Sequence, residues 1–182
     1  WEPLETLKPG DRIAVPRDIP EPQRVREWPE EEIIMLAHLI GDGSFVRRQP
    51  IRYANTDEAN LSVVSEAARY FGVEAVRDEY EAARTTTLRL RCPQRLTDGR
   101  RNPIAQWLDD LGLFGLRSHE KFIPSEVFSL PRKHIALFLR HLWATDGSMS
   151  WDDKYGSARI HYSTTSRNLV DDVSSLLSRL GI

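Results

Sequence analysis

The sequence predicts an α+β protein in which one structural unit occurs twice. Two strongly apolar stretches end in the same Asp-Gly dipeptide, in LAHLIGDGSFV (36–46) and in LRHLWATDGSM (139–149). Residues 51–73 align with residues 160–182, and residues 88–91 alternate Leu with Arg as a half-buried strand does. Each unit is therefore expected to contain a helix, a strand hairpin and an amphipathic helix, in that order.

The composition indicates a globular protein. With 182 residues, of which 40% are hydrophobic, the chain is long enough to bury a core. No stretch has the apolar length of a membrane span and no charged and apolar leader opens the sequence, so we expect a soluble cytoplasmic protein. The single Cys92 cannot form an internal disulfide, which fits a reducing compartment.

The first segment lies outside the repeat. It has a strand-like pattern at Ile13 and Val15 and then a linker interrupted by proline. We therefore expect residues 1–25 to be a short strand and a linker.

The first helix of each unit is predicted from its apolar run. Pro29 and Pro131 mark the two starts, and residues 33–40 and 135–144 are apolar apart from one histidine in the first run and the pair Arg140-His141 in the second. A helix that is apolar all round is buried on every side. We expect the two helices to pack against each other with a pseudo-twofold axis between them.

The second part of each unit gives the register of the duplication. Asp42 and Asp146 are offset by 104 residues, whereas residues 51–73 align with 160–182 at an offset of 109. The difference fits a longer hairpin in the second copy. The first copy continues into further strands and the second stops at Ile182, so the second unit is expected to be incomplete in this chain.

A short helix is predicted between the two copies. Asn102 can cap a helix whose first residue is Pro103, and Gly112 can end it.

The Asp-Gly pairs suggest a metal site. Gly43 and Gly147 are expected to end their helices in the left-handed conformation. Asp42 and Asp146 then lie at the negative ends of two helix dipoles, where two carboxylates close to the axis favour a hard divalent cation such as Mg²⁺ or Mn²⁺. The alternative is that Asp-Gly is simply a common turn dipeptide.

The charge distribution suggests a nucleic acid partner. The net charge is −2, but residues 84–101 hold six Arg against one Asp, and Arg outnumbers Lys 21 to 4 in the chain. Arginine can fork onto phosphate or guanine, although such clusters are often ordinary solvated faces. Two carboxylates with a metal beside a basic sheet suit hydrolysis of a phosphodiester.

These features resemble the LAGLIDADG homing endonucleases of inteins. The motifs MLAHLIGDG (35–43) and LRHLWATDG (139–147) match the family motif, and LGLFGLRSHEKFIP between them resembles the intein segment that supplies an active-site lysine, here Lys121. The resemblance covers about residues 28–182, and the chain as a whole is similar to inteins of replicative DNA helicases. It implies two αββαββα units that form a saddle over DNA.

The resemblance also implies domains, partners and site residues. The domains are residues 1–25 (remnant of a splicing domain), 26–128 (first half) and 129–182 (truncated second half), and the partners are double-stranded DNA and a host protein in cis, with a monomeric chain. The implied catalytic residues are Asp42, Asp146 and Lys121, and Gly41 and Thr145 join the two acids as implied metal ligands. The implied DNA contacts are Arg47, Arg48, Arg52, Arg89, Arg91, Lys154, Arg159 and His161.

Two alternatives and one departure accompany this interpretation. The chain could be a DNA-binding module that does not cut, or a structural insert that supports splicing.

Where the family prefers a tiny residue, Ala37 complies but His141 does not, so we expect looser packing of the two helices. His38 and His141 are more simply interpreted as interface residues than as metal ligands. Because the chain begins at Trp1 and ends at Ile182, without the terminal nucleophile and the His-Asn pair of splicing, we expect it not to splice.

Overall fold

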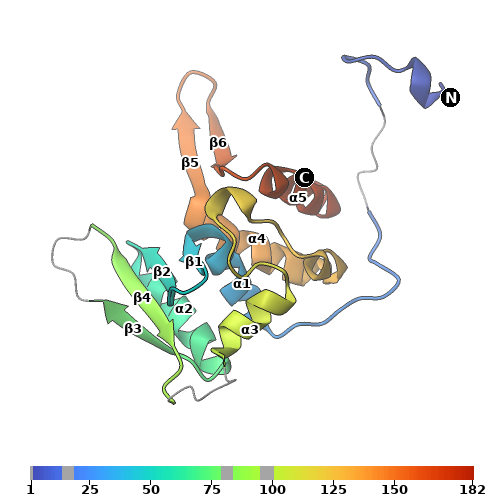
Figure 1. Ribbon diagram of the computed structural model, residues 1–182. Coiled ribbons are helices and arrows are strands. Elements are labelled where there is room, and N and C mark those ends of the chain that lie inside the picture. Colours follow the sequence, from blue (N-terminus) through green and yellow to red (C-terminus); the bar gives the residue numbers. More distant parts are fainter. Residues whose placement is uncertain (1, 14–18, 79–83, 95–100) are drawn as a thin grey trace.

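The computed structural model describes residues 2–13, 19–78, 84–94 and 101–182 (Figure 1). Its α-helices are α1 (Glu30–Asp42), α2 (Glu58–Tyr70), α3 (Pro103–Asp110), α4 (Arg132–Asp146) and α5 (Arg167–Arg179). Its strands are β1 (Gly43–Ser44), β2 (Ile51–Asn55), β3 (Glu74–Asp78), β4 (Thr86–Arg91), β5 (Gly147–Asp152) and β6 (Ser157–Tyr162). Short 3-10 helices span Leu4–Thr6, Ser118–Glu120 and Ser125–Ser129. The α+β class is confirmed.

The order and register of the elements agree with the duplication. Helices α2 and α5 start and end at the predicted offset of 109 residues. The first strand of each hairpin also pairs equivalently, because Gly43 lies opposite Tyr53 and Gly147 lies opposite Tyr162. Strand β5 is longer than β1, as the difference between the two offsets required.

The first unit contains a four-stranded antiparallel sheet with the strand order β1-β2-β4-β3. Alternate residues of its central strands are buried on the side of α1 and α2, among them Tyr53 and Leu88. Arg52 and Arg89 are register partners on the opposite face, which no helix covers in Figure 1. The sheet therefore has an apolar face towards the helices and a basic face that is open.

Helices α1 and α4 pack against each other at the centre of the molecule. In α1 every side chain from Met35 to Ile40 is at most 1% exposed, which confirms the predicted burial. Helix α4 differs, since Lys133, Ala136, Arg140 and Ala144 form an exposed stripe. The expected all-round burial is wrong for α4 because nothing in the described residues covers the face that carries Arg140.

Glycine ends α1 and α4 for a different reason from the predicted one. Gly43 and Gly147 have φ of −79° and −84°, which is extended backbone, so the expected left-handed conformation is wrong. A Cβ at Gly43 would lie 2.6 Å from Leu39 Cα, and one at Gly147 would lie 2.7 Å from Trp143 Cγ. A missing side chain therefore lets each strand turn back tightly against its own helix.

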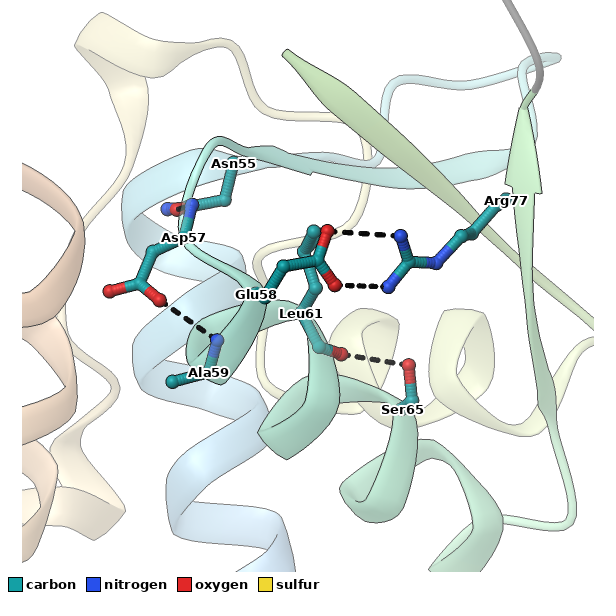
Figure 2. A network of polar contacts seen from close by, with 7 residues as sticks. All are labelled: Asn55, Asp57, Glu58, Ala59, Leu61, Ser65 and Arg77. Carbon is teal, nitrogen blue, oxygen red and sulfur yellow. Dashed lines mark hydrogen bonds and ion pairs between the residues drawn. The ribbon is translucent and has the colours of Figure 1, made fainter.

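The remaining helices are held by local caps. Asn102 accepts hydrogen bonds from Ile104 N and Ala105 N, which confirms the predicted start of α3, and Gly112 has a φ of +74°. Figure 2 shows the start of α2, where the Asp57 carboxylate accepts a hydrogen bond from Ala59 N at 2.8 Å.

An ion pair joins α2 to the edge of the first sheet. In the same view the guanidinium of Arg77, on β3, forks onto Glu58 in the first turn of α2. The first of these two hydrogen bonds is 3.0 Å long.

The N-terminal segment differs from its prediction. Ile13 is not in a strand, and Val15 lies outside the described residues. No described strand lies beside this segment to pair with it. Further along, Glu21 accepts hydrogen bonds from Arg132 N (2.9 Å) and from Arg179 (2.8 Å), so the linker is attached to α4 and α5.

The hairpin of β5 and β6 projects away from the helices (Figure 1). Met149, Trp151 and Ile160 lie on the same face as Tyr162, yet they are 75%, 65% and 65% exposed. No described residue covers this apolar face. Among the described helices, none has both the length and the apolar character that a membrane span requires.

Candidate active site

The ends of α1 and α4 lie side by side. A Cβ on Gly41 would lie 2.5 Å from Thr145 Cβ and would overlap the Thr145 hydroxyl group. Each of these residues directly precedes an aspartate, so the contact brings the start of each Asp-Gly pair to the same place. The backbones approach closely although His141 occupies a position where the family prefers a tiny residue, so the expected loosening is wrong.

The carboxylates of Asp42 and Asp146 influence each other. Burial raises the pKa of both carboxyl groups, and the charge of Asp42 raises the pKa of Asp146 further. The nearby Lys121 opposes both shifts, and Asn55 opposes the shift at Asp42. Two half-buried carboxylates are therefore close together, and the charge of Lys121 acts on both.

This arrangement fits a divalent cation of the magnesium type. Among the residues that the structure describes, no group of three or more His, Cys, Asp or Glu side chains could hold a metal. Mg²⁺ does not need one, because it is commonly held by one or two carboxylates and completes its shell with water and phosphate oxygens. Asp42 and Asp146 supply such oxygens, and the Gly41 carbonyl already accepts from Lys121 Nζ at 3.2 Å.

Lys121 closes the end of α1. Its side chain is 3% exposed, and Nζ donates to the carbonyls of Leu39 (3.0 Å), Ile40 (2.8 Å) and Gly43 (2.8 Å) as well as to that of Gly41. The carbonyls of Leu39, Ile40 and Gly41 belong to the last turn of α1, where helix carbonyls lack intrahelical partners, and that of Gly43 follows directly after the helix. Burial lowers the pKa of Lys121 to about 8, while Asp146 and Asp42 act to raise it.

Sequence reasoning missed Asn55 and Asn60. Asn55 Nδ2 donates to Asp42 Oδ2 at 2.7 Å, and its Oδ1 accepts from Asp57 N at 2.8 Å. Asn60 Nδ2, on α2, donates to the carbonyl of Ala144 near the end of α4 at 3.0 Å. The run Asn55-Thr56-Asp57 before α2 is a capping signal, but nothing in it pointed to Asp42.

The two central histidines form an interface pair, as predicted. His38 Nε2 lies 3.0 Å from His141 Nδ1, and His38 Nδ1 lies 2.9 Å from the hydroxyl of Tyr53. Burial lowers the pKa of His38 to about 3 and also lowers that of His141. Both rings are therefore neutral at pH 7 and are occupied by hydrogen bonds away from the carboxylates.

Three of the predicted DNA contacts lie on the first sheet. Arg52 and Arg89 face outward as register partners, and both lie beside Asp78. Arg91 lies on the same face, 3.6 Å from Glu74. All three thus share the open face, and acids of β3 partly neutralise them.

The other predicted contacts are spread over two places. Arg159 and His161 share one face of β6, where Arg159 pairs with Asp152, and Lys154 lies in the adjoining turn. Arg47 and Arg48 are exposed in the loop between β1 and β2. Of the six arginines in residues 84–101, two (95 and 100) lie outside the described residues.

Comparison with known proteins identifies the second half. Residues 133–182 match the family described as LAGLIDADG-like domain. This part of the chain is therefore similar to a LAGLIDADG-like domain. The match begins in α4, includes Asp146, and ends with α5, so it contains one of the two Asp-Gly helices.

The relatives are much longer proteins. The chain is 41% identical over 184 residues to the replicative DNA helicase DnaB of Rhodothermus marinus, covering all of this chain and 19% of the relative. It is 39% identical to DnaB of Synechocystis, covering 21% of it, and 28% identical to the protein RecA of Mycobacterium tuberculosis, covering 22% of it. The chain thus spans about a fifth of the length of these relatives, and segments similar to it occur in proteins with different names.

Proposed function

We propose that this chain is the endonuclease part of an intein and makes a metal-dependent double-strand cut in a long, specific DNA site. The observation that carries the proposal is the proximity of two repeat-related aspartates, Asp42 and Asp146, at adjacent helix ends. Outward arginines on the sheets of both units, Arg52, Arg89 and Arg91 on the first and Arg159 on the second, support DNA as the substrate.

Each group of the proposed site has a distinct part. Asp42 and Asp146 hold a divalent cation through their carboxylate oxygens, and Asn55 orients the first of them. Such a cation lowers the pKa of an attacking water and stabilises charge on the phosphate and the leaving oxygen. Lys121 fixes the end of α1, and its charge adds to the positive potential beside the scissile phosphate. Outward arginines such as Arg52 and Arg159 bind the duplex.

The relatives support an inserted element. The similarity covers all of this chain but only about a fifth of a DnaB helicase and of a RecA protein, as expected for one unit carried by different hosts. The host would be a protein in cis, the location cytoplasmic and the active form a monomer. The target would be the host gene at the position where the insert is absent.

A plasmid assay tests this function. The substrate carries the related helicase gene joined across the insertion point, and the cation is Mg²⁺ or Mn²⁺. We expect the wild type to cut this plasmid, and Asp42→Asn with Asp146→Asn to abolish cutting while binding persists. Asp110→Asn, an exposed aspartate at the end of α3, is the matched control and should cut normally. Unchanged cutting by the double variant would refute the mechanism.

Two other functions predict different results in the same assay. A DNA-binding module of this fold would shift the target duplex in a gel without cutting it. A structural insert that supports splicing would bind no duplex in preference to any other. Binding by a true DNA-binding protein should also weaken steeply as salt is added.

A further inference from the structure

A basic pocket of about 660 Å³ lies next to the paired acids. Its walls come from the loop after β1 and from the segment that leads into the 3-10 helix Ser118–Glu120. Arg47, Arg117 and Lys121 line it together with Ser44 and Ser118, and no carboxylate is among its lining residues. A pocket with three cations and two hydroxyl groups favours an anion.

The two walls are fixed to each other. Gly115 N donates a hydrogen bond to the carbonyl of Phe45, a fully buried residue whose ring lies 4.9 Å from Lys121 Nζ. Gly115 has a φ of +98°, and a Cβ there would lie 3.0 Å from Arg47 Nε. The side chain of Arg47 therefore runs across bare backbone at Gly115, which directs it along the pocket.

The charges of the two arginines are available to a ligand. Neither Arg47 nor Arg117 forms an ion pair within the described part of the chain. The carboxylate influenced by Arg47 is that of Asp109, which is already bound by Arg101 at 2.7 Å. Lys121 donates its hydrogen bonds to carbonyls at the end of α1. The donors of this pocket that remain for a ligand are therefore the exposed guanidinium groups of Arg47 and Arg117.

The pocket adjoins both halves of the candidate active site. It is lined by Gly43, which directly follows Asp42. A second pocket of about 360 Å³ shares Ser118 and Lys121 with it and is lined by Asp146. An anion in the basic pocket would thus lie beside the place where the proposed function puts the scissile phosphate.

We propose that this pocket binds one backbone phosphate of the DNA, next to the phosphate that is cut, with Arg47 and Arg117 as its two arms. The inference rests on the proposed function and extends it to Arg117, which lies on neither sheet. Guanidinium groups suit this task because they fork onto phosphate oxygens. The contact is to the backbone, so it strengthens binding to every sequence and positions the strand for cutting.

The test uses Arg47→Ala, Arg117→Ala and the double variant, with Arg69→Ala on the exposed side of α2 as the matched control. Binding to a labelled target duplex is measured over a range of salt concentrations. We expect the affinity of the double variant to be lower by a factor of about ten or more. The slope of its log affinity against log salt should become less negative by about 0.9, the contribution of one phosphate contact. A non-target duplex should lose affinity by a similar factor, and Arg69→Ala should match the wild type.

A duplex with a single neutral methylphosphonate locates the phosphate. Moved along the strand near the cut, the substitution should weaken wild-type binding strongly at one position, and the double variant should be insensitive there. If the wild type binds and cuts but the double variant has the same affinity and salt slope, the pocket inference is wrong and the proposed function stands. If the wild type binds no duplex at all, the proposed function itself fails.

Discussion

His38 Nε2 lies 3.0 Å from His141 Nδ1, so the two central helices share a hydrogen bond between neutral rings. The rings lie on opposite helices and complete a chain that ends at the Tyr53 hydroxyl. The two rings fill the space between the helices at this point. Protonation of either ring would place a charge in that buried space.

We predict that acid destabilises the protein through His38. Its pKa falls from 6.5 in the unfolded chain to about 3 in the folded one. Between these values the unfolded state binds the extra proton, so stability is lost as pH falls below about 6.5, by roughly 1.4 kcal/mol per pH unit for one proton. His38→Leu, which copies the aligned Leu142, should flatten this slope in urea unfolding measured from pH 6.5 to 5. His119→Gln, an exposed control, should keep the wild-type slope; equal slopes for His38→Leu and wild type would contradict the prediction.

Removing the paired carboxylates should stabilise the fold. Because burial raises the pKa of Asp42 and Asp146, their charged forms are unfavourable at pH 7. The gain from an amide should decline as pH falls below the raised pKa values and vanish below the ordinary carboxyl pKa of 3.8. Asp146→Asn should raise the melting temperature at pH 7, where each 1 kcal/mol gained corresponds to about 2–4 °C in a chain of this size. A lower melting temperature for this variant at pH 7 would show that the charge of Asp146 does not destabilise the folded state.

Divalent cations should stabilise the wild type and not the double asparagine variant. A ligand that binds only the folded state at about 100 times its Kd adds about 2.7 kcal/mol. Thermal melting with and without Mg²⁺ measures the effect on wild type and on Asp42→Asn with Asp146→Asn. Equal shifts in both proteins would place any cation elsewhere.

The contact between Gly41 and Thr145 should tolerate no added atom. Gly41→Ala puts a Cβ inside the Thr145 side chain and should cost about 1–3 kcal/mol, the usual range for overpacking. Combining it with Thr145→Gly should restore part of that loss, since the space is then returned from the other helix. Urea unfolding of both single variants and the double variant measures the coupling; strict additivity would mean that the helices do not meet here.

Lys121 should matter for stability as well as for cutting. Lys121→Met leaves buried carbonyls of α1 without their donor, and we expect a loss of about 2–4 kcal/mol. Lys133→Met, on the exposed stripe of α4, should change stability by less than about 0.5 kcal/mol. Should Lys121→Met unfold at the wild-type urea concentration, the lysine would have no capping role.

The duplication made the centre of the fold predictable from sequence. An apolar run that ends in Asp-Gly occurs twice, and the first copy, which has no polar face, has few places to be buried except against the second. The closeness of Asp42 and Asp146 follows from that packing. The exposed stripe of α4 was not predicted, because Ala136 and Ala144 suit either a buried or an exposed face.

The side-chain contacts around the acids could not be read from the sequence. Asn55 reaches Asp42 from the end of a neighbouring strand, and this depends on strand register and rotamer. Likewise, a glycine after each aspartate is consistent both with a left-handed turn and with a position that has no room for a side chain. Only the backbone angles of Gly43 and Gly147 separate these two causes.

The two helix ends are closed by unlike groups. A lysine ammonium caps α1 beside Asp42, whereas the neutral amide of Asn60 reaches α4 beside Asp146. The backbones of the two units are therefore related by symmetry, but the charges at their helix ends are not. A duplex lying across the axis would present its two strands to unequal chemistry, so one strand would break first and a relaxed circle would build up before the linear product.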